Sequence, residues 1–221
     1  MDFKGPTPGD YANVRSLNRA FLSVLCNSMH GKLLRQPLHE SIRCQLPGLT
    51  GLQLERLSES PFLLMSLRER DSSLWRELMA DSPTADLLVA RPMQATDRLI
   101  AAVLGFLWQL ARHNAYATRL ISGASPDWCE RLADTTLVEL MQNTAGREDL
   151  LVARFADESE RWSRLLGPGI SATKKIRVAA QLSVLQAMLT GAPGPGSRRL
   201  RAAACATPVP SAAAFDRRGR R

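Results

Sequence analysis

Apolar residues recur at helical spacing along most of the chain, which predicts a mainly helical protein. Leu17, Phe21, Leu22 and Leu25 fall at three- and four-residue spacing, so a helix places their side chains on one face. A similar pattern over Leu99–Ile121 predicts a second long helix. Leu and Ala carry the apolar content while aromatic residues make up only 5%, and this balance favours helices over sheets.

Two capping boxes indicate where shorter helices begin. Thr50 is followed by Gln53 at the start of a predicted helix over Gly51–Ser58, and Thr136 is followed by Glu139 before another apolar helix. In such a box each of the two side chains accepts a hydrogen bond from the other residue's backbone N–H. The spacing therefore predicts matching helix starts in two distant parts of the chain.

Other local signals fill in the order of elements. Leu38–Leu46 predicts a short helix, and Ser125 with Pro126 marks the start of another. The apolar run Phe62–Leu67 is either a buried extended segment or a buried helical turn, and periodicity leaves both open. Asp71 suits the N-cap of the next helix, which contains Trp75.

The order of long helix, two short capped helices, apolar run and Trp-bearing helix occurs twice, which predicts an internal duplication. We expect an all-α fold of two repeated multi-helical modules, packed as an intramolecular pseudo-dimer and followed by a disordered basic C-terminal tail. The matched residues are Phe21 and Phe106, Cys44 and Cys129, Leu49 and Leu132, Leu54 and Leu137, and Trp75 and Trp162. The expected packing core is Phe21, Leu22, Leu25, Leu49, Leu54, Trp75, Phe106, Leu107, Leu110, Leu132, Leu137 and Trp162.

Composition sets the expected boundaries. The first module spans 13–80, a polar and proline-bearing linker 81–97, the divergent second module 98–166 and a C-terminal helix 170–190. Residues 191–221 are rich in Pro, Gly, Ala and Arg and have almost no large apolar side chains. Such a segment cannot bury enough surface to offset its ordering entropy, so we expect it to be disordered.

The positive charge is concentrated in this tail. The whole chain carries a formal charge of +8, and residues 191–221 contribute seven Arg and one Asp, or +6, which leaves +2 for the rest. DNA contact is therefore expected from the tail and a few basic side chains elsewhere. The predicted helix 51–58 makes a poor recognition helix because Arg56 lies between Glu55 and Glu59. The candidate DNA-binding residues are Arg68, Arg70, Lys174, Lys175, Arg177, Arg198, Arg199 and Arg201.

The sequence contains no recognisable catalytic motif, so we expect neither an enzyme nor a small-molecule substrate. Its four cysteines and three histidines lack the clustered spacing of a zinc site, so no metal or other cofactor is expected. Residues 1–10 lack the apolar core of a signal peptide, and the apolar stretch Leu99–Ala111 is too short to span a membrane. A cytoplasmic location with no membrane partner is therefore expected.

The segment from Leu17 to Met79 resembles the FlhD family of flagellar master transcriptional regulators. The resemblance begins with Leu17-Asn18 and Phe21-Leu22, continues through Leu46–Leu64 and ends in Arg68–Leu78. The family pattern L-x-x-L-T/S-x-x-Q-x-x-x-L-A is matched here by Leu46, Leu49, Thr50, Gln53, Leu57 and Ser58. The chain is about twice the usual length of that family, and its second copy has Asp134-Thr135-Thr136 where the first has Thr50-Gly51.

This resemblance implies an all-helical, intertwined dimer that activates transcription together with a zinc-binding partner, FlhC, which supplies much of the DNA contact. The first functional hypothesis is therefore an FlhD-like transcriptional regulator acting through an FlhC-like protein partner, with DNA contacted mainly by that partner or by the tail. The alternative is a helical adaptor or chaperone of a secretion or conjugation system without nucleic-acid binding.

Overall fold

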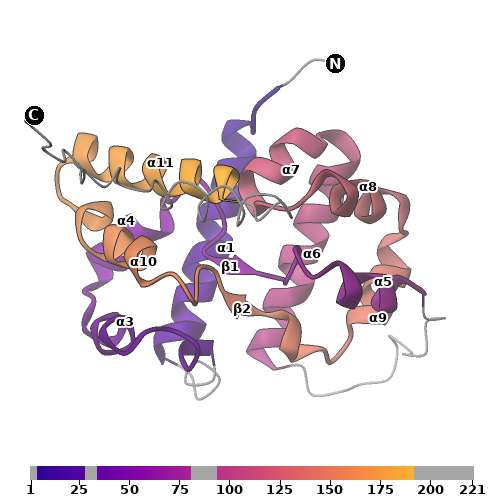
Figure 1. Ribbon diagram of the computed structural model, residues 1–221, viewed down its shortest axis with the longest axis horizontal. Coiled ribbons are helices and arrows are strands. Elements are labelled where there is room, and N and C mark those ends of the chain that lie inside the picture. The colour runs from indigo at the N-terminus through magenta and orange to yellow at the C-terminus, as the bar shows by residue number, and fades with distance from the viewer. Residues whose placement is uncertain (1–3, 28–33, 81–93, 192–221) are drawn as a thin grey trace, which may run out of the picture. The chain divides into compact units, whose positions relative to one another are not determined.

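Helices hold most of the residues that the computed structural model describes, which are 4–27, 34–80 and 94–191 (Figure 1). The chain divides into two units, Met1–Leu189 and Thr190–Arg221. Every described helix and strand begins within the first unit. The expected disordered tail, apart from Gly191, and most of the expected linker lie outside the described residues.

The described elements fall into two halves and a final helix. The first half (residues 8–80) contains helices α1 (Pro8–Asn27), α3 (Glu40–Gln45) and α4 (Gly51–Ser58), the 3-10 turn η1 (Leu46–Gly48), strand β1 (Met65–Ser66) and α5 (Ser72–Ala80). The second half (residues 95–166) contains α6 (Ala95–His113), α7 (Ala115–Ser122), α8 (Pro126–Asp134), α9 (Leu137–Thr144), η2 (Glu148–Leu150), β2 (Val152–Ala153) and α10 (Ser159–Leu166). The 3-10 turn η3 (Pro168–Ile170) leads into α11 (Lys174–Thr190).

Both predicted capping boxes are confirmed. The Thr50 hydroxyl accepts the N–H of Gln53 at 3.3 Å, and the Gln53 side chain accepts the N–H of Thr50 at 2.8 Å. Thr136 and Glu139 form the same pair of bonds, both at 3.2 Å. These bonds satisfy N–H groups that have no partner within the first turn of a helix, and so they fix where α4 and α9 begin.

The prediction of one continuous helix over Leu99–Ile121 is wrong, because Asn114 interrupts it and separates α6 from α7. That residue leaves the helical conformation at φ −156° and ψ 81°, and its side chain accepts the N–H of Ala117 at 2.9 Å. Asparagine caps a helix well, so α7 starts anew there. The predicted helix Leu38–Leu46 is also shorter than expected, since its α-helical part is α3 and the chain continues as η1.

The apolar run Phe62–Leu67 contains no helix and includes β1, which resolves the choice that periodicity left open. β1 pairs antiparallel with β2, with Met65 opposite Ala153 and Ser66 opposite Val152. The expectation of a mainly helical fold is confirmed, and each of the two strands β1 and β2 spans only two residues. The hydrogen bonds between β1 and β2 satisfy backbone N–H and C=O groups in two buried segments that are not helical.

Several similar local features occur in both halves at a nearly constant separation in sequence. The capping threonines, Thr50 and Thr136, are 86 residues apart, and the two strands are 87 residues apart. Four pairs in α1 and α6, each 86 residues apart, are buried in both halves: Val14 and Ile100, Asn18 and Leu104, Phe21 and Leu107, and Leu25 and Ala111.

This register corrects several pairings expected from the sequence. Phe106 is only half-buried, so the expectation of equivalent buried sites for Phe21 and Phe106 is wrong. Leu107 is the buried residue at the constant separation from Phe21. Cys129 is buried whereas Cys44 is exposed, so these two cysteines do not occupy matching environments.

Most residues of the expected packing core belong to one buried apolar cluster or pack against it. Leu137 is the clear exception, because it is the first residue of α9 and is exposed. The buried members are Phe21, Leu22, Leu25, Trp75, Leu107, Leu110, Leu132 and Trp162, and the half-buried members are Leu49, Leu54 and Phe106.

Candidate functional site

The last helix of each half packs against the other half. In Figure 1, α5 of the first half lies beside α9, while α10 of the second half lies beside α3. The ring of Trp75 in α5 meets the ring of Trp128 in α8 edge to face, with centroids 5.2 Å apart. An aromatic pair of this geometry stabilises the contact beyond its buried area. α1 and α6 also pack against each other, and they lie between the α5–α9 contact and the α10–α3 contact.

A buried tryptophan anchors each of the helices α5 and α10. Trp75 Nε1 donates to the carbonyl oxygens of Leu67 and Arg68, both at 3.1 Å. Trp162 Nε1 donates to the carbonyl oxygen of Arg154 at 2.7 Å. Just before each helix, one residue has a left-handed backbone, Arg68 at φ 56° and Phe155 at φ 59°. Left-handed geometry is costly for these residue types, so both turns depend on the surrounding packing.

A buried ion pair lies beside the β1–β2 pairing. Arg154 Nη2 is 3.0 Å from Glu69 Oε1, and both side chains are less than a tenth exposed. The guanidinium also donates to the carbonyl oxygens of Leu63, Met65 and Ser122. Burial lowers the pKa of Arg154, while the neighbouring Glu69 carboxylate opposes that shift. We call β1, β2, Glu69 and Arg154 the junction. Its hydrogen-bond donors and acceptors come from both halves, so the junction connects the first half to the second.

Asn18 holds the first-half side of the junction. Its Nδ2 donates to the carbonyl oxygen of Phe62 at 2.9 Å, and its Oδ1 accepts the N–H of Leu64 at 2.8 Å. The side chain is fully buried, so these bonds satisfy polar groups that water cannot reach. Neither Asn18 nor the Glu69–Arg154 pair was predicted as important. The one available signal was a charged Arg154 within the apolar run Leu150–Phe155.

Several predicted DNA-binding residues make structural contacts. Arg68 forms an ion pair with Asp71 at 2.7 Å and lies 3.9 Å from Asp149. Arg177 is largely buried, and its Nε lies 3.1 Å from Glu59. These two guanidiniums are thus at least partly neutralised by neighbouring carboxylates.

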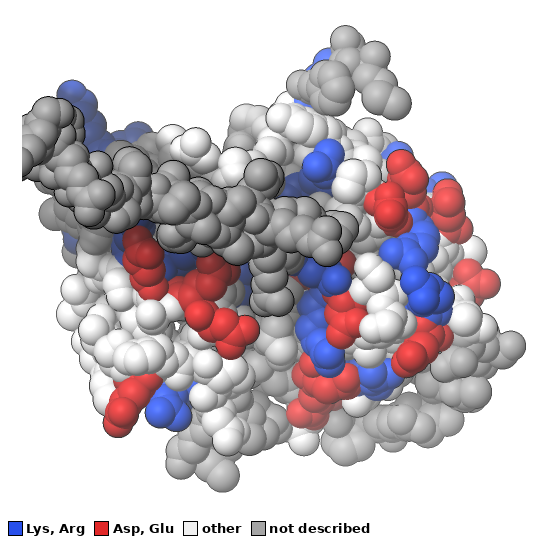
Figure 2. All heavy atoms as spheres, in the orientation of Figure 1, with Lys and Arg blue, Asp and Glu red and all other residues white. Residues whose placement is uncertain are grey.

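The other predicted basic residues differ in their surroundings. Arg70 Nη2 donates to the carbonyl oxygen of Met188 at 2.9 Å, so it ties α11 to the body without a carboxylate. Lys174 and Lys175 are exposed in the first turn of α11 and have no ion-pair partner within the described part of the chain. Arg198, Arg199 and Arg201 lie outside the described residues. On the face shown in Figure 2, acidic and basic side chains are interleaved rather than segregated.

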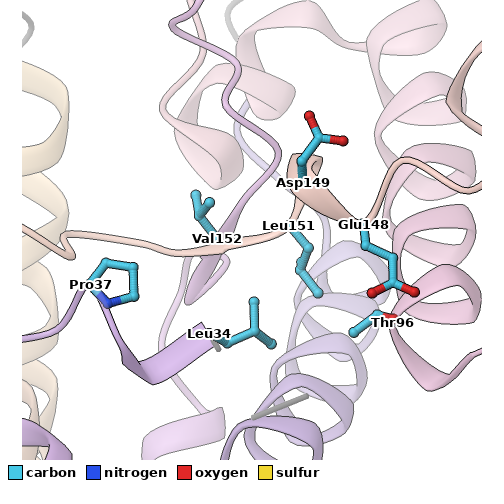
Figure 3. Close-up of a pocket in the computed structure, with 7 residues that line it drawn as sticks. All are labelled: Leu34, Pro37, Thr96, Glu148, Asp149, Leu151 and Val152. Carbon is cyan, nitrogen blue, oxygen red and sulfur yellow. The ribbon is translucent and has the colours of Figure 1, made fainter. Parts of the chain in front are cut away.

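A hollow of about 270 Å³ lies beside β2 and the start of α6 (Figure 3). Its lining consists of Leu34, Pro37, Thr96, Glu148, Asp149, Leu151 and Val152. The Asp149 carboxylate is already engaged by Arg147, at 2.8 and 3.0 Å, which holds the pKa of Asp149 below its usual range. Thr96 Oγ1 is buried and has no hydrogen-bond partner among the described residues. The lining is mostly apolar and includes no nucleophile paired with a base.

The described part of the chain contains free cysteines, but its possible metal ligands do not form a cluster. Among the residues that the structure describes, no group of three or more His, Cys, Asp or Glu side chains is placed to hold a metal ion. Cys26, Cys44 and Cys129 are free thiols, and burial raises the pKa of Cys129 to about 12. A thiol with so high a pKa stays protonated at neutral pH and is a poor nucleophile. No described helix is long and apolar enough to cross a membrane.

Comparison with known proteins does not assign the chain to a family. No protein-family model, no curated protein and no solved structure matches the chain.

Proposed function

We propose that the chain is an internally duplicated FlhD-like protein whose two halves form an intertwined pseudo-dimer within one polypeptide. The recurrence of capping boxes, buried helix positions, strands and tryptophans at separations of 86 or 87 residues supports the duplication. The strand register fits it as well, because Met65 lies opposite Ala153 and Ser66 opposite Val152. At a separation of 87 residues, exchanging the two halves leaves this pairing unchanged.

The observation that carries the proposal is the reciprocal exchange of the last helices. α5 packs on the second half, and α10 packs on the first. In the FlhD-like dimer implied by the sequence resemblance, two chains are intertwined. Here one chain would supply both partners, which agrees with its roughly doubled length.

The proposed activity is transcriptional activation in the cytoplasm, without enzymatic chemistry, through an FlhC-like zinc-binding partner. The distribution of basic groups supports a division of labour between the two proteins. Arg68 and Arg177 are paired with carboxylates, and Arg70 donates to the main-chain carbonyl oxygens of Gly123 and Met188. Among the predicted residues in the described part of the chain, Lys174 and Lys175 are the exposed cations without such a contact. Two lysines supply little phosphate affinity, so most DNA contact would come from the partner or the Arg-rich tail.

An electrophoretic mobility shift assay tests this proposal. The full chain is titrated onto DNA fragments of the source genome, with and without a co-expressed zinc-binding FlhC-like protein. We expect weak, salt-sensitive shifts from the chain alone and a sequence-dependent shift only with the partner. Lys174→Gln and Lys175→Gln, each as a single variant, should weaken shifts on all fragments alike. Lys4→Gln, near the other end of the described chain, removes the same single charge and serves as the control. No shift in either condition would overturn the DNA role.

One observation favours the alternative of a helical adaptor or chaperone. Leu52 in α4 and Val138 in α9 are 60% and 58% exposed, and they are 86 residues apart. Large apolar side chains exposed at matching positions of both halves suit contact with another protein. If DNA shifts are absent while Leu52→Asp and Val138→Asp each abolish capture of a secretion or conjugation component, the adaptor function replaces the regulatory one.

A further inference from the structure

α11 has one face that is fastened to the rest of the first unit. Gln181, Val184 and Met188 are buried along this face. Gln181 Nε2 donates to the carbonyl oxygens of Arg56 and Gly169, at 3.1 and 3.2 Å. These contacts, together with the bond from Arg70 to the Met188 carbonyl, fix the rotation of the helix about its own axis.

A second apolar row follows another face of the same helix. We call Val178, Leu182, Leu185 and Leu189 the α11 stripe. Val178, Leu182 and Leu189 are 40%, 49% and 39% exposed, and Leu185 is half-buried. At 100° per residue the stripe lies about a quarter of a turn from the fastened face. The fold therefore leaves Val178, Leu182 and Leu189 exposed, while Leu185 also packs against the core of the first unit.

The spacing of the stripe matches a helix–helix contact. Its members follow one another at intervals of four, three and four residues. This is the alternation of core positions in coiled coils, in which apolar side chains of one helix pack between those of another. An isolated exposed leucine needs no explanation, but four apolar residues at this spacing indicate a helical partner.

Charge and symmetry favour a second copy of the chain as that partner. α11 contains no acidic residue, and its exposed cations, Lys174 and Lys175, lie at its N-terminal end. In an antiparallel pair, these lysines lie near the C-terminal carbonyl groups of the other α11, where a positive charge is stabilised by the helix dipole. A parallel pair would place lysine against lysine. We propose that the α11 stripe is a homodimer contact, formed by two α11 helices that run antiparallel.

The antiparallel arrangement is self-complementary. A two-fold axis near the middle of the stripe sets Val178 against Leu189 of the second copy, and Leu182 against Leu185 of the second copy. Ala179 and Gln186, which lie beside the stripe, carry no charge that the contact would have to desolvate. A two-fold contact of this kind closes at two chains and does not grow into a filament.

The stripe is short, so the dimer should be weak and depend on concentration. Four side chains bury less than the roughly 800 Å² per partner of a standard interface, and we expect a dissociation constant of about 10 µM or weaker. The contact does not depend on the FlhC-like partner or on DNA, so it can be tested separately from the proposed function.

Sedimentation velocity of the full chain, over concentrations up to about 500 µM, is the test. We expect the mass to move from 24.3 kDa toward twice that value. Val178→Glu and Leu182→Glu should each weaken association at least about ten-fold, because the dimer would bury the new carboxylate. Ile176→Glu is the matched control: Ile176 is 50% exposed on the same helix but lies off the stripe, so this variant should dimerise like the parent.

Circular dichroism of each variant checks that the helices are retained. A chain that stays monomeric over the whole concentration range would overturn the proposal, including the case in which a different protein is captured through α11. Equal association of Leu182→Glu and Ile176→Glu, or equal loss in both, would place any dimer contact elsewhere and would overturn it too.

Discussion

Trp75 and Trp162 each donate their indole N–H to a carbonyl oxygen eight residues earlier in the chain, at Leu67 and Arg154 respectively. Both rings are fully buried, and both helices pack on the half of the fold to which they do not belong in sequence. The two tryptophans therefore make the same kind of anchoring contact, each 87 residues from the other. In the proposed duplication they hold the exchanged helices in position.

Replacing either anchor should cost similar stability. Trp75→Ala and Trp162→Ala should each lower the free energy of unfolding by about 3–5 kcal/mol, because each removes a fully buried ring and its hydrogen bond. Chemical denaturation followed by far-UV circular dichroism measures the change. Trp108→Ala should cost less, since that ring is only half-buried. A near-zero effect at either Trp75 or Trp162 would show that its helix is not held by the ring.

The Glu69–Arg154 pair can be tested with a double-mutant cycle. Each residue is replaced by the residue that lies 87 positions away in the other half. At a separation of 87 residues, Leu67 corresponds to Arg154 and Ala156 to Glu69. Arg154→Leu alone should cost about 3–5 kcal/mol, because it leaves the Glu69 carboxylate buried without its cation.

The double variant Arg154→Leu with Glu69→Ala should lose less stability than the two single variants added together, with a coupling of about 1–3 kcal/mol. Urea unfolding of all four proteins gives this coupling. Strictly additive losses would mean that the buried pair does not act as a unit.

The second capping box should make stability depend on pH, whereas the first should not. The Thr136 hydroxyl and N–H donate to Glu139 and lower the pKa of that carboxyl. A carboxyl with a lowered pKa in the folded state stabilises the fold above its ordinary pKa, and this stabilisation is lost as the pH falls through the folded-state value. In the first box Gln53 makes the same bonds without a titratable group.

Glu139→Gln should therefore resemble the parent at pH 7 and lose less stability on acidification to about pH 3. Gln53→Glu should do the opposite and steepen the loss. The measurement is the free energy of unfolding of the three proteins at several pH values. Parallel pH profiles for all three would show that the Glu139 box does not contribute to the pH dependence.

The helical fold could be predicted largely because its signals are local. The boxes at Thr50 and Thr136 form within single helical turns, and the packed face of the first helix follows directly from its periodicity. The break at Asn114 escaped prediction because apolar spacing continues across it. Phe106 was matched in place of Leu107 because neighbouring apolar residues fit a repeat equally well until burial distinguishes them.

The junction could not be predicted in the same way. The partners of Arg154 are Glu69 and the carbonyl groups of Leu63, Met65 and Ser122, which lie between 32 and 91 residues away in sequence. No short-range pattern specifies such a set. The basic candidates show a related difficulty, because Arg68 and Arg177 have the right chemistry for phosphate, and only the fold reveals the carboxylates beside them.

The central claim is that each half completes the other, and cutting the chain between the halves tests it most directly. A specific protease site is introduced within residues 81–93, the full protein is cleaved, and the product is examined by size-exclusion chromatography and by thermal unfolding. The account predicts that the two fragments elute together in a one-to-one ratio and unfold in a single transition. Fragments that separate without denaturant, each folded and each with its own transition, would contradict it.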